Sequence, residues 1–548
     1  MQKRIFSLSI ILLVLFQTSW AQSYVVSGIE KTDKEGMQYE VLGKMGKHYW
    51  VYKKNGSVST IAQYNDQMQL VKQNDLTFLP AQVKQIEFIK RADQLFAFYQ
   101  FQNNKTVYAA LATLNGDGQL KAEPIILDTA QNIRPGSNVK IFNLIESDDH
   151  QKIMLFSVNT SNPASIKIKT NSYNGNFEEI ADATITINSN NKKSTLSDFA
   201  LDNKGNLFCL RNATQNNAAP AVSLIYLSEG GREVMESSVL NSQFLLDDIR
   251  LKVDNNNNRV LLNSFYAIAK KGNIEGLFTY IWDANTKREV LSSANRFTDA
   301  NRALMTTKRN LKTALDTYYI DKVNPQSNGD FVVMAESAET YSNRSAFSRW
   351  DYFWGGPFYN PFIFNYWYRP FGFYPWARLG WMGFPGMDWG WGGFGWGGFG
   401  WGGWGGWGWG GLGWSGFWNP FASFGYPTVT YNAKQIALMS FDQKGNLNWV
   451  KTIDKSQSDL NVDQFIGYGS FENNNGVNII YYQKQKGQRQ FVMNTLSADG
   501  IVSKSESIIL QEKRFDWIPK ALKQVGEKEC IIPYQYNNKI GFAKIQLK

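Results

Sequence analysis

A chain of 548 residues that is 43% hydrophobic and 19% charged can bury a large core, so its composition excludes general disorder. The formal net charge of +10 is spread over the chain without a dense basic run, so nucleic acid is not expected as a partner. His48 and His150 are the only histidines, and a metal centre built mainly from histidines is therefore not expected either.

Residues 1–21 have the pattern of a secretory signal peptide. Lys3 and Arg4 precede an apolar run at residues 5–16, which is too short for a permanent membrane span. Small residues stand before the predicted cleavage point after Ala21, and no cysteine lies nearby to carry a lipid. We therefore expect export to the periplasm or an association with the outer membrane, with an extracellular location less favoured.

The rest of the chain, residues 22–548, is predicted to form a single all-β domain. Short β-branched and aromatic runs alternate with turns rich in Asn, Asp and Gly. These runs group into units of roughly 45–55 residues, the size of a propeller blade. The predicted units begin near Tyr39, Val83, Val139, Leu196, Leu245, Thr317, Val462 and Trp517.

The last predicted unit has only three strands before the chain ends, and residues 24–31 are left over at its start. A ring in which the N-terminal strand completes the last blade has no open sheet edge between the two ends. The sequence therefore predicts an eight-bladed β-propeller. Seven blades are the nearest alternative, and tandem β-sandwiches are the third.

Cys209 and Cys530 are the only cysteines, so no disulfide framework is expected. Both fall on second strands, in the fourth and eighth units. In an eight-fold ring these blades lie opposite each other, far beyond the Cα separation of ~7 Å that a disulfide allows. We expect two buried free thiols.

Residues 341–428 differ from the rest of the chain. Fourteen of the nineteen tryptophans lie between Trp350 and Trp418, and residues 389–433 contain no charge. Glycine disfavours a helix, and the spacing of the aromatic residues fits neither face of a strand. The flanking runs, residues 331–338 and 435–441, are predicted as second and third strands of one blade, so the segment is a low-complexity insertion within the propeller.

Two readings of this insertion remain open: a loop collapsed on the propeller face, or an interaction surface. Tryptophan favours membrane interfaces, aromatic clusters and sugar faces. The candidate interaction residues are Trp391, Trp396, Trp401, Trp404, Trp407, Trp409 and Trp414. They would contact an envelope protein, a glycan, a membrane interface or a second copy of the chain.

The hairpin at residues 441–449 resembles those of pyrroloquinoline-quinone propellers, because Asp442, Gly445 and Trp449 follow in the same order. Compared with those hairpins, one residue fewer separates the Asp from the Gly. Among the units of this chain, only the one with this hairpin has a Trp at the corresponding position. The resemblance supports a propeller hairpin and not that cofactor. No cofactor is predicted.

Other motifs are interpreted as structural. Residues 254–258 alternate oxygen ligands as in a calcium loop but lack the bidentate Glu, so a hairpin tip is favoured. The adjacent acids Asp148-Asp149, Glu178-Glu179 and Asp247-Asp248 point to opposite faces of a strand and form no catalytic pair by themselves. Distant acids could still converge at the ring centre. No catalytic residue is named, because no nucleophile elbow, phosphate loop or paired-cysteine motif is present.

As a whole, the chain resembles exported propeller-like proteins of Bacteroidota that have no defined activity. The resemblance depends on the Lys3-Arg4 signal, the Ala21-Gln22 junction and the aromatic insertion after residues 335–339, and it implies an envelope location. Our first hypothesis is a non-catalytic envelope protein whose propeller presents the Gly/Trp-rich loop for binding. The alternatives are a propeller enzyme acting on glycans or peptides, and a self-assembling adhesive or matrix component.

Overall fold

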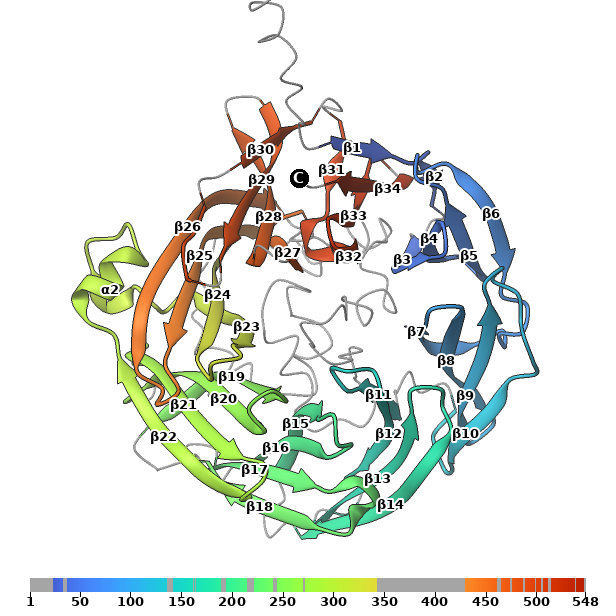
Figure 1. The fold of residues 1–548 in the computed structure, drawn as a ribbon, viewed down its shortest axis with the longest axis horizontal. Helices are drawn as coiled ribbons and strands as arrows, with labels where there is room; N and C mark the ends of the chain where they lie inside the picture. Colours follow the sequence, from blue (N-terminus) through green and yellow to red (C-terminus); the bar gives the residue numbers. More distant parts are fainter. Residues whose placement is uncertain are drawn as a thin grey trace, which may run out of the picture.

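Eight antiparallel sheets are arranged as the blades of a ring in the computed structural model (Figure 1). The chain is therefore an eight-bladed β-propeller, as predicted. The structure describes residues 23–546 except 33–36, 136–140, 161, 163, 189–193, 214–220, 240–243, 270–271, 343–428, 461–464, 474–475, 486–487, 498, 504–505, 511–513 and 538. The predicted signal peptide lies outside the described residues.

Seven blades have four strands in sequence order, from the ring axis outward. Blade 1 contains β3 (Met37–Met45), β4 (His48–Asn55), β5 (Val58–Tyr64) and β6 (Leu70–Asp75); blade 2 contains β7 (Val83–Lys90), β8 (Gln94–Asn103), β9 (Thr106–Asn115) and β10 (Ile125–Ala130). Blade 3 contains β11 (Phe142–Glu146), β12 (Lys152–Asn159), β13 (Ser165–Asn174) and β14 (Glu179–Asn188); blade 4 contains β15 (Ser194–Leu201), β16 (Leu207–Ala213), β17 (Ala221–Leu227) and β18 (Val234–Ser238).

The second half of the ring follows the same pattern. Blade 5 contains β19 (Leu245–Asp254), β20 (Arg259–Ala267), β21 (Gly276–Asp283) and β22 (Arg288–Arg296); blade 6 contains β23 (Tyr318–Pro325), β24 (Phe331–Ser342), β25 (Val429–Phe441) and β26 (Leu447–Leu460). Blade 7 contains β27 (Tyr468–Asn473), β28 (Gly476–Gln485), β29 (Gln488–Leu496) and β30 (Glu506–Ile509).

Blade 8 joins the two ends of the chain, which confirms the predicted closure. Its inner position is divided between β31 (Asp516–Trp517) and β32 (Lys523–Gly526), and β33 (Glu529–Gln535) and β34 (Lys539–Gln546) follow. The N-terminal β1 (Ser23–Val26) and β2 (Glu30–Lys31) pair with β34 as its outer strand, with Val26 opposite Ala543. The Tyr534 hydroxyl donates to the Ser27 carbonyl at 2.7 Å.

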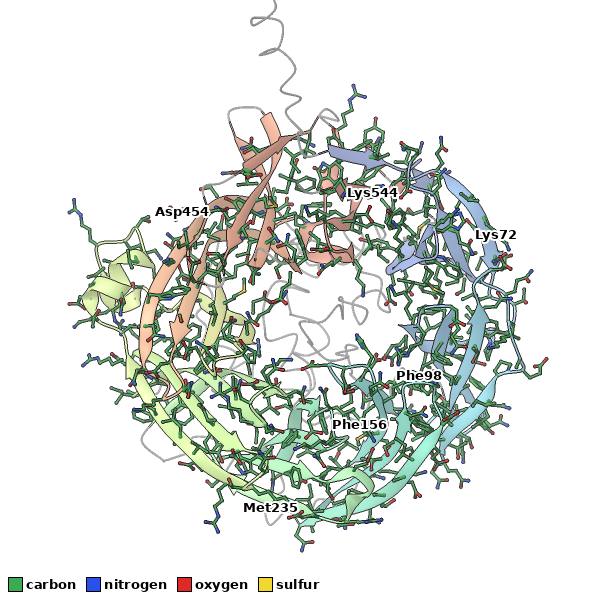
Figure 2. The ribbon with its side chains drawn as sticks, viewed as in Figure 1. Lys72, Phe98, Phe156, Met235, Asp454 and Lys544 are labelled. Carbon is green, nitrogen blue, oxygen red and sulfur yellow. The ribbon has the colours of Figure 1, made fainter. Side chains whose placement is uncertain are left out.

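The hydrophobic core is divided into layers between neighbouring blades. Phe98 of blade 2 packs in one cluster with Leu155 of blade 3, and Phe208 of blade 4 packs on Trp282 of blade 5 with ring centroids 5.8 Å apart. Figure 2 shows Phe98 and Phe156 inside the body of the ring, whereas Lys72 and Met235 lie toward its outer edge. Each blade thus buries both faces, which explains the dense apolar runs of the middle strands.

Helices are short in the described part of the chain, in agreement with the absence of helical periodicity. The α-helix α2 (Asp299–Leu304) and the 3-10 helix η2 (Leu311–Thr313) lie in the connection from β22 to β23. Two other 3-10 turns are η1 (Glu229–Gly231) and η4 (Pro519–Ala521). The connection that carries α2 projects from the rim beside β26 (Figure 1).

The two cysteines are buried free thiols, as predicted. Cys209 lies on β16 of blade 4 and Cys530 on β33 of blade 8, each a second strand. Burial raises the pKa of both thiols far above the ordinary value, so both side chains act as small apolar groups.

Candidate functional site

The strands that flank the insertion extend beyond the regular blade as a three-stranded stalk, formed by residues 338–342, 429–433 and 457–460. The ladder between β24 and β25 continues to the pair Ser342–Val429, and β26 continues to Leu460 opposite Thr430. β24 shifts register between Glu336 and Ala338, and β25 shifts at the neighbouring level. Such aligned bulges bend a blade without ending its strand pairing.

Ion pairs and a helical connection brace this stalk. Glu339, a nearly buried carboxylate on β24, pairs with Lys308 at 2.8 Å and also with Lys434 of β25. Lys308 belongs to the connection that carries α2, and α2 packs on β26. The Tyr318 hydroxyl lies 2.8 Å from the Gln435 side-chain oxygen and 3.0 Å from the Met305 carbonyl. The root of the insertion is therefore held from two sides.

A buried polar network lies at the base of the stalk. The ammonium group of Lys455, whose side chain is 0% exposed, pairs with Glu336 and lies 2.7 Å from the Gln457 side-chain oxygen. The Gln457 amide donates to the carbonyls of Gly467 at 3.0 Å and Tyr482 at 2.7 Å in blade 7. Burial lowers the pKa of Lys455, while Glu336 opposes that shift. The network joins two strands of the insertion-bearing blade to its neighbour.

The structure places the insertion where the sequence predicted it. β24 and β25 are the second and third strands of blade 6, so residues 343–428 connect them. The strand ladder includes Tyr341 and Ser342, which the predicted boundary had assigned to the insertion. The seven candidate tryptophans from Trp391 to Trp414 lie outside the described residues.

A second candidate site lies on the inner strands, where ionisable side chains from separate blades approach one another. This inner cluster consists of Glu40 on β3, Glu87 on β7 and Lys523 on β32, with Lys90 and Glu146 nearby. Glu40 is only 7% exposed and has no hydrogen-bond partner among the described residues. Inner strands β3, β7 and β32 each shift register, and bulges of this kind often re-aim side chains near functional sites.

Burial and charge strongly perturb this cluster. Burial raises the pKa of Glu40 well above its ordinary value; Lys523 opposes the shift and Glu87 adds to it. Burial lowers the pKa of Lys523 to about 8, and the nearby carboxylates of Glu40 and Glu146 limit the decrease. Lys523 can therefore exchange a proton near neutral pH, and Glu40 holds its proton to a higher pH than an ordinary carboxyl group, as groups used in general acid–base chemistry do.

A similar arrangement lies on the inner strands of blades 5 to 7. Burial raises the pKa of Glu472 on β27 to about 8, against the attraction of Lys322 and Lys252. Lys252 also pairs with Asp148 of blade 3 at 3.2 Å. The sequence allowed for acidic side chains that converge at the ring centre. Of the residues in these two clusters, it singled out only Asp148. The sequence feature that could have revealed these clusters is a charged residue within the otherwise apolar first strand of many units.

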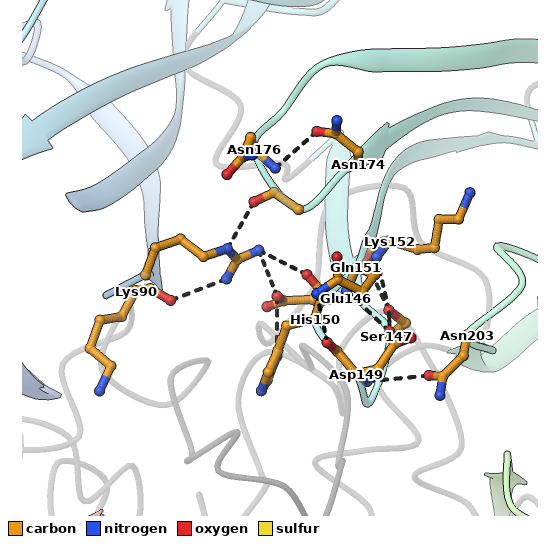
Figure 3. Close-up of polar contacts among 12 residues, drawn as sticks. Lys90, Glu146, Ser147, Asp149, His150, Gln151, Lys152, Asn174, Asn176 and Asn203 are labelled. Atoms are coloured by element: carbon orange, nitrogen blue, oxygen red, sulfur yellow. Dashed lines mark hydrogen bonds and ion pairs between the residues drawn. The ribbon is translucent and has the colours of Figure 1, made fainter. Parts of the chain in front are cut away.

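Polar contacts between turns connect neighbouring blades. The Arg91 guanidinium pairs with Glu146 at 2.8 Å, the Asp149 amide donates to the Asn203 side chain at 3.2 Å, and the Asn203 amide donates to Asn255 at 2.9 Å. Figure 3 shows the contacts around Glu146 and the one between Asp149 and Asn203. Further blade pairs are joined by Asn257–Gln326, Asp321–Tyr468, Gln524–Glu472, Lys44–Glu529 and Lys90–Lys44. In the described part of the chain, polar contacts therefore link every pair of neighbouring blades.

Three of the motifs interpreted as structural have partners within their own turns. Asp254 of the calcium-like loop pairs with Arg259 at 2.8 Å and accepts from the Asn257 side chain at 2.9 Å. Asp442 of the quinone-propeller-like hairpin accepts from the amide of Asn446 at 2.8 Å. The Glu178 carboxylate accepts a hydrogen bond of 2.6 Å from the side-chain nitrogen of Asn174 in the same turn.

Within the residues that the structure describes, no group of three or more His, Cys, Asp or Glu side chains could hold a metal ion. Over the same residues, no helix is long and apolar enough to cross a membrane.

No protein-family model and no curated protein matches the chain. Among solved structures, a prolyl endopeptidase is 6% identical over 92% of this chain and 55% of its own, with a TM-score of 0.38. Prolyl oligopeptidase B from Galerina marginata is 8% identical over the same shares, with a TM-score of 0.37. An apocarotenoid oxygenase from Synechocystis is 6% identical over 59% of this chain and 88% of its own, with a TM-score of 0.28. This chain spans about half the length of the two peptidases, and similarities this low carry no argument about activity.

Proposed function

We propose that this chain is an exported, non-catalytic scaffold of the cell envelope, in which the propeller presents the Gly/Trp-rich segment at residues 341–428 to a binding partner. One observation carries the proposal. The strands around this segment continue as a paired and braced stalk to Ser342 and Val429. A stalk of this kind gives the segment a defined origin on the ring, which a display function requires.

The aromatic composition supports binding by this segment. Its tryptophans combine a large apolar area with a ring donor, which suits contact with a protein, a glycan or the interface of a membrane. The predicted signal peptide supports an envelope location, and the default location for this proposal is the periplasm or the periplasmic side of the outer membrane.

Deletion of residues 345–427 tests the proposal. Ser342 and Val429 already face each other across the ladder, so a short Asn-Gly turn can replace the segment. We expect the shortened protein to keep its far-UV spectrum and cooperative unfolding but to lose retention in the envelope fraction and its crosslinked partners. Equal retention and the same crosslinks in both proteins would refute the proposal. Loop-dependent oligomers of the purified protein would favour self-assembly instead.

A second candidate function is favoured by the inner cluster. The buried Glu40, whose pKa is raised, and Lys523, whose pKa is lowered to about 8, place an acid and a base on inner strands of neighbouring blades, so hydrolysis of a glycan or peptide at the ring centre is the alternative. Purified protein incubated with soluble glycan and peptide mixtures should then release products detectable by mass spectrometry. Glu40→Gln and Lys523→Met should each abolish that release, and an absence of products from the wild type would remove this candidate.

A further inference from the structure

The connection that braces the stalk carries an unusual concentration of positive charge. Residues 296–313 contain five Arg or Lys residues and one acid, Asp299, for a net charge of +4. The whole chain has a net charge of +10. A short connection at the rim therefore holds a large share of the net charge of the protein.

Part of this charge is engaged in holding the connection together. The buried Arg302 guanidinium donates to the carbonyls of Glu275 at 2.8 Å and Phe297 at 3.1 Å, and it pairs with the Glu275 carboxylate at 3.2 Å. Arg296 uses the same carboxylate at 3.0 Å. Both arginines help to fix the shape of the connection; Arg302 is buried and not available to a partner, whereas the side chain of Arg296 remains 74% exposed.

The remaining cations around the stalk are exposed to solvent. Arg309 and Lys312 are exposed and have no ion-pair partner among the described residues. Lys308 and Lys434 share Glu339, yet their side chains remain 52% and 50% exposed. Two cations on a single buried carboxylate leave an excess of positive charge, so this root patch of Lys308, Arg309, Lys312 and Lys434 is electropositive.

Large aliphatic side chains are exposed on the same two elements, the connection and the stalk. Leu304 at the end of α2 is 50% exposed, and Leu460 at the end of the stalk strand β26 is 55% exposed. Lys308 pairs with Glu339 of the stalk and α2 packs on β26, so the connection lies against the stalk. Basic side chains next to exposed aliphatic ones are the combination that binds an anionic lipid surface, because headgroup phosphates attract the cations while the apolar groups enter the interface.

We propose that the root patch, with Leu304 and Leu460, docks the propeller onto an anionic lipid bilayer. The inference deepens the proposed envelope function and depends on its location beyond the inner membrane. Each cation near an anionic leaflet contributes about a fivefold gain in partitioning, and charge and apolar contact together give more stable binding than either alone. This contribution falls with ionic strength, because the charges are exposed.

Vesicle co-sedimentation of the full mature chain tests the inference. The probes are vesicles of phosphatidylglycerol mixed with phosphatidylcholine, and vesicles of phosphatidylcholine alone. We expect the wild type to bind the anionic vesicles, to bind more weakly at high salt, and to leave the neutral vesicles largely free. Arg309→Gln/Lys312→Gln should weaken binding by about tenfold or more, because both side chains are exposed and unpaired.

A matched control removes the same charge from turns that lie away from the root patch. Lys47 and Lys528 are exposed in the β3–β4 and β32–β33 turns, and Lys47→Gln/Lys528→Gln should bind anionic vesicles as the wild type does. Equal binding by the Arg309/Lys312 variant and the wild type would overturn the inference, as would equal losses in the two double variants. The protein that lacks residues 345–427 separates the two proposals. If it still binds anionic vesicles through the root patch, this inference is upheld even where the display function fails its own test.

Discussion

Lys455 and Glu336 form an ion pair in which the lysine side chain is completely buried, directly beneath the strands that lead into the Gly/Trp-rich segment. The pair lies between β26 and β24, and Gln457 extends it to blade 7. Breaking a buried ion pair leaves the other charge without compensation, so these two residues link the stability of the stalk to that of the interface between blades 6 and 7.

The first prediction concerns this pair. Lys455→Ala leaves Glu336 and Gln457 without their shared cation and should reduce the free energy of unfolding by about 3–5 kcal/mol. The double variant Lys455→Met/Glu336→Leu removes both charges and should recover most of that loss. Denaturant unfolding measures both values. A double variant as unstable as Lys455→Ala would show that the two charges do not act as a pair.

Ring closure gives the second prediction. Deleting β1 and β2 exposes the edge of β34 and removes the contact between Tyr24 and Trp517, whose ring centroids are 6.1 Å apart. We expect Tm to fall by about 5 °C or more and concentration-dependent aggregation to begin, because an open edge pairs with other chains. Tyr534→Phe removes the hydroxyl that donates to Ser27 while keeping the aromatic ring, and it should cost about 1 kcal/mol. A truncated chain with unchanged Tm would contradict the closure.

The third prediction is a pH dependence from Glu472. Its pKa is raised to about 8 in the folded protein, mainly by burial, whereas an unfolded chain has the ordinary value of about 4.3. Between these values the folded state holds one more proton, so this residue makes stability fall as pH rises from about 4.3 to about 8. Glu472→Gln should remove that fall and raise Tm at pH 9 by about 1–2 °C relative to the wild type.

Thermal unfolding of both proteins from pH 5 to about pH 9 supplies the measurement. If the wild type instead gained stability relative to Glu472→Gln as the pH rises over this range, a raised pKa of Glu472 would be excluded. Glu229→Gln, at a carboxylate paired with Lys152 at 3.0 Å, serves as a comparison away from the inner strands.

The fourth prediction concerns the amine of Lys523. Its pKa of about 8 is held up by the Glu40 carboxylate, against burial and the nearby Lys90. Glu40→Gln should therefore move the pH midpoint of Lys523 acylation below about 8, as measured by competitive labelling and mass spectrometry with exposed Lys47 as the reference. An unchanged midpoint would mean that Glu40 does not interact with this amine.

The resemblance between units was sufficient to predict the ring, because each unit repeats the same alternation of apolar runs and Asn/Asp/Gly turns. The leftover strand at residues 24–31 also predicted the closure on β34. Boundaries were less accurate. The unit expected near Val462 has its first strand at Tyr468, and β24 continues through Ser342, since a ladder extends for as long as its partner offers hydrogen bonds.

The sequence by itself determined the eight-fold β-architecture, the two isolated thiols and the place of the insertion between the second and third strands of blade 6. These depend on local patterning and chain order, which a linear sequence contains. Only the tertiary structure brought Glu40, Glu87 and Lys523 together from blades 1, 2 and 8, and joined Lys308, Glu339 and Lys434 at the root of the insertion. Charge interactions depend on distances across blades, and residues far apart in the chain become neighbours only when the ring closes.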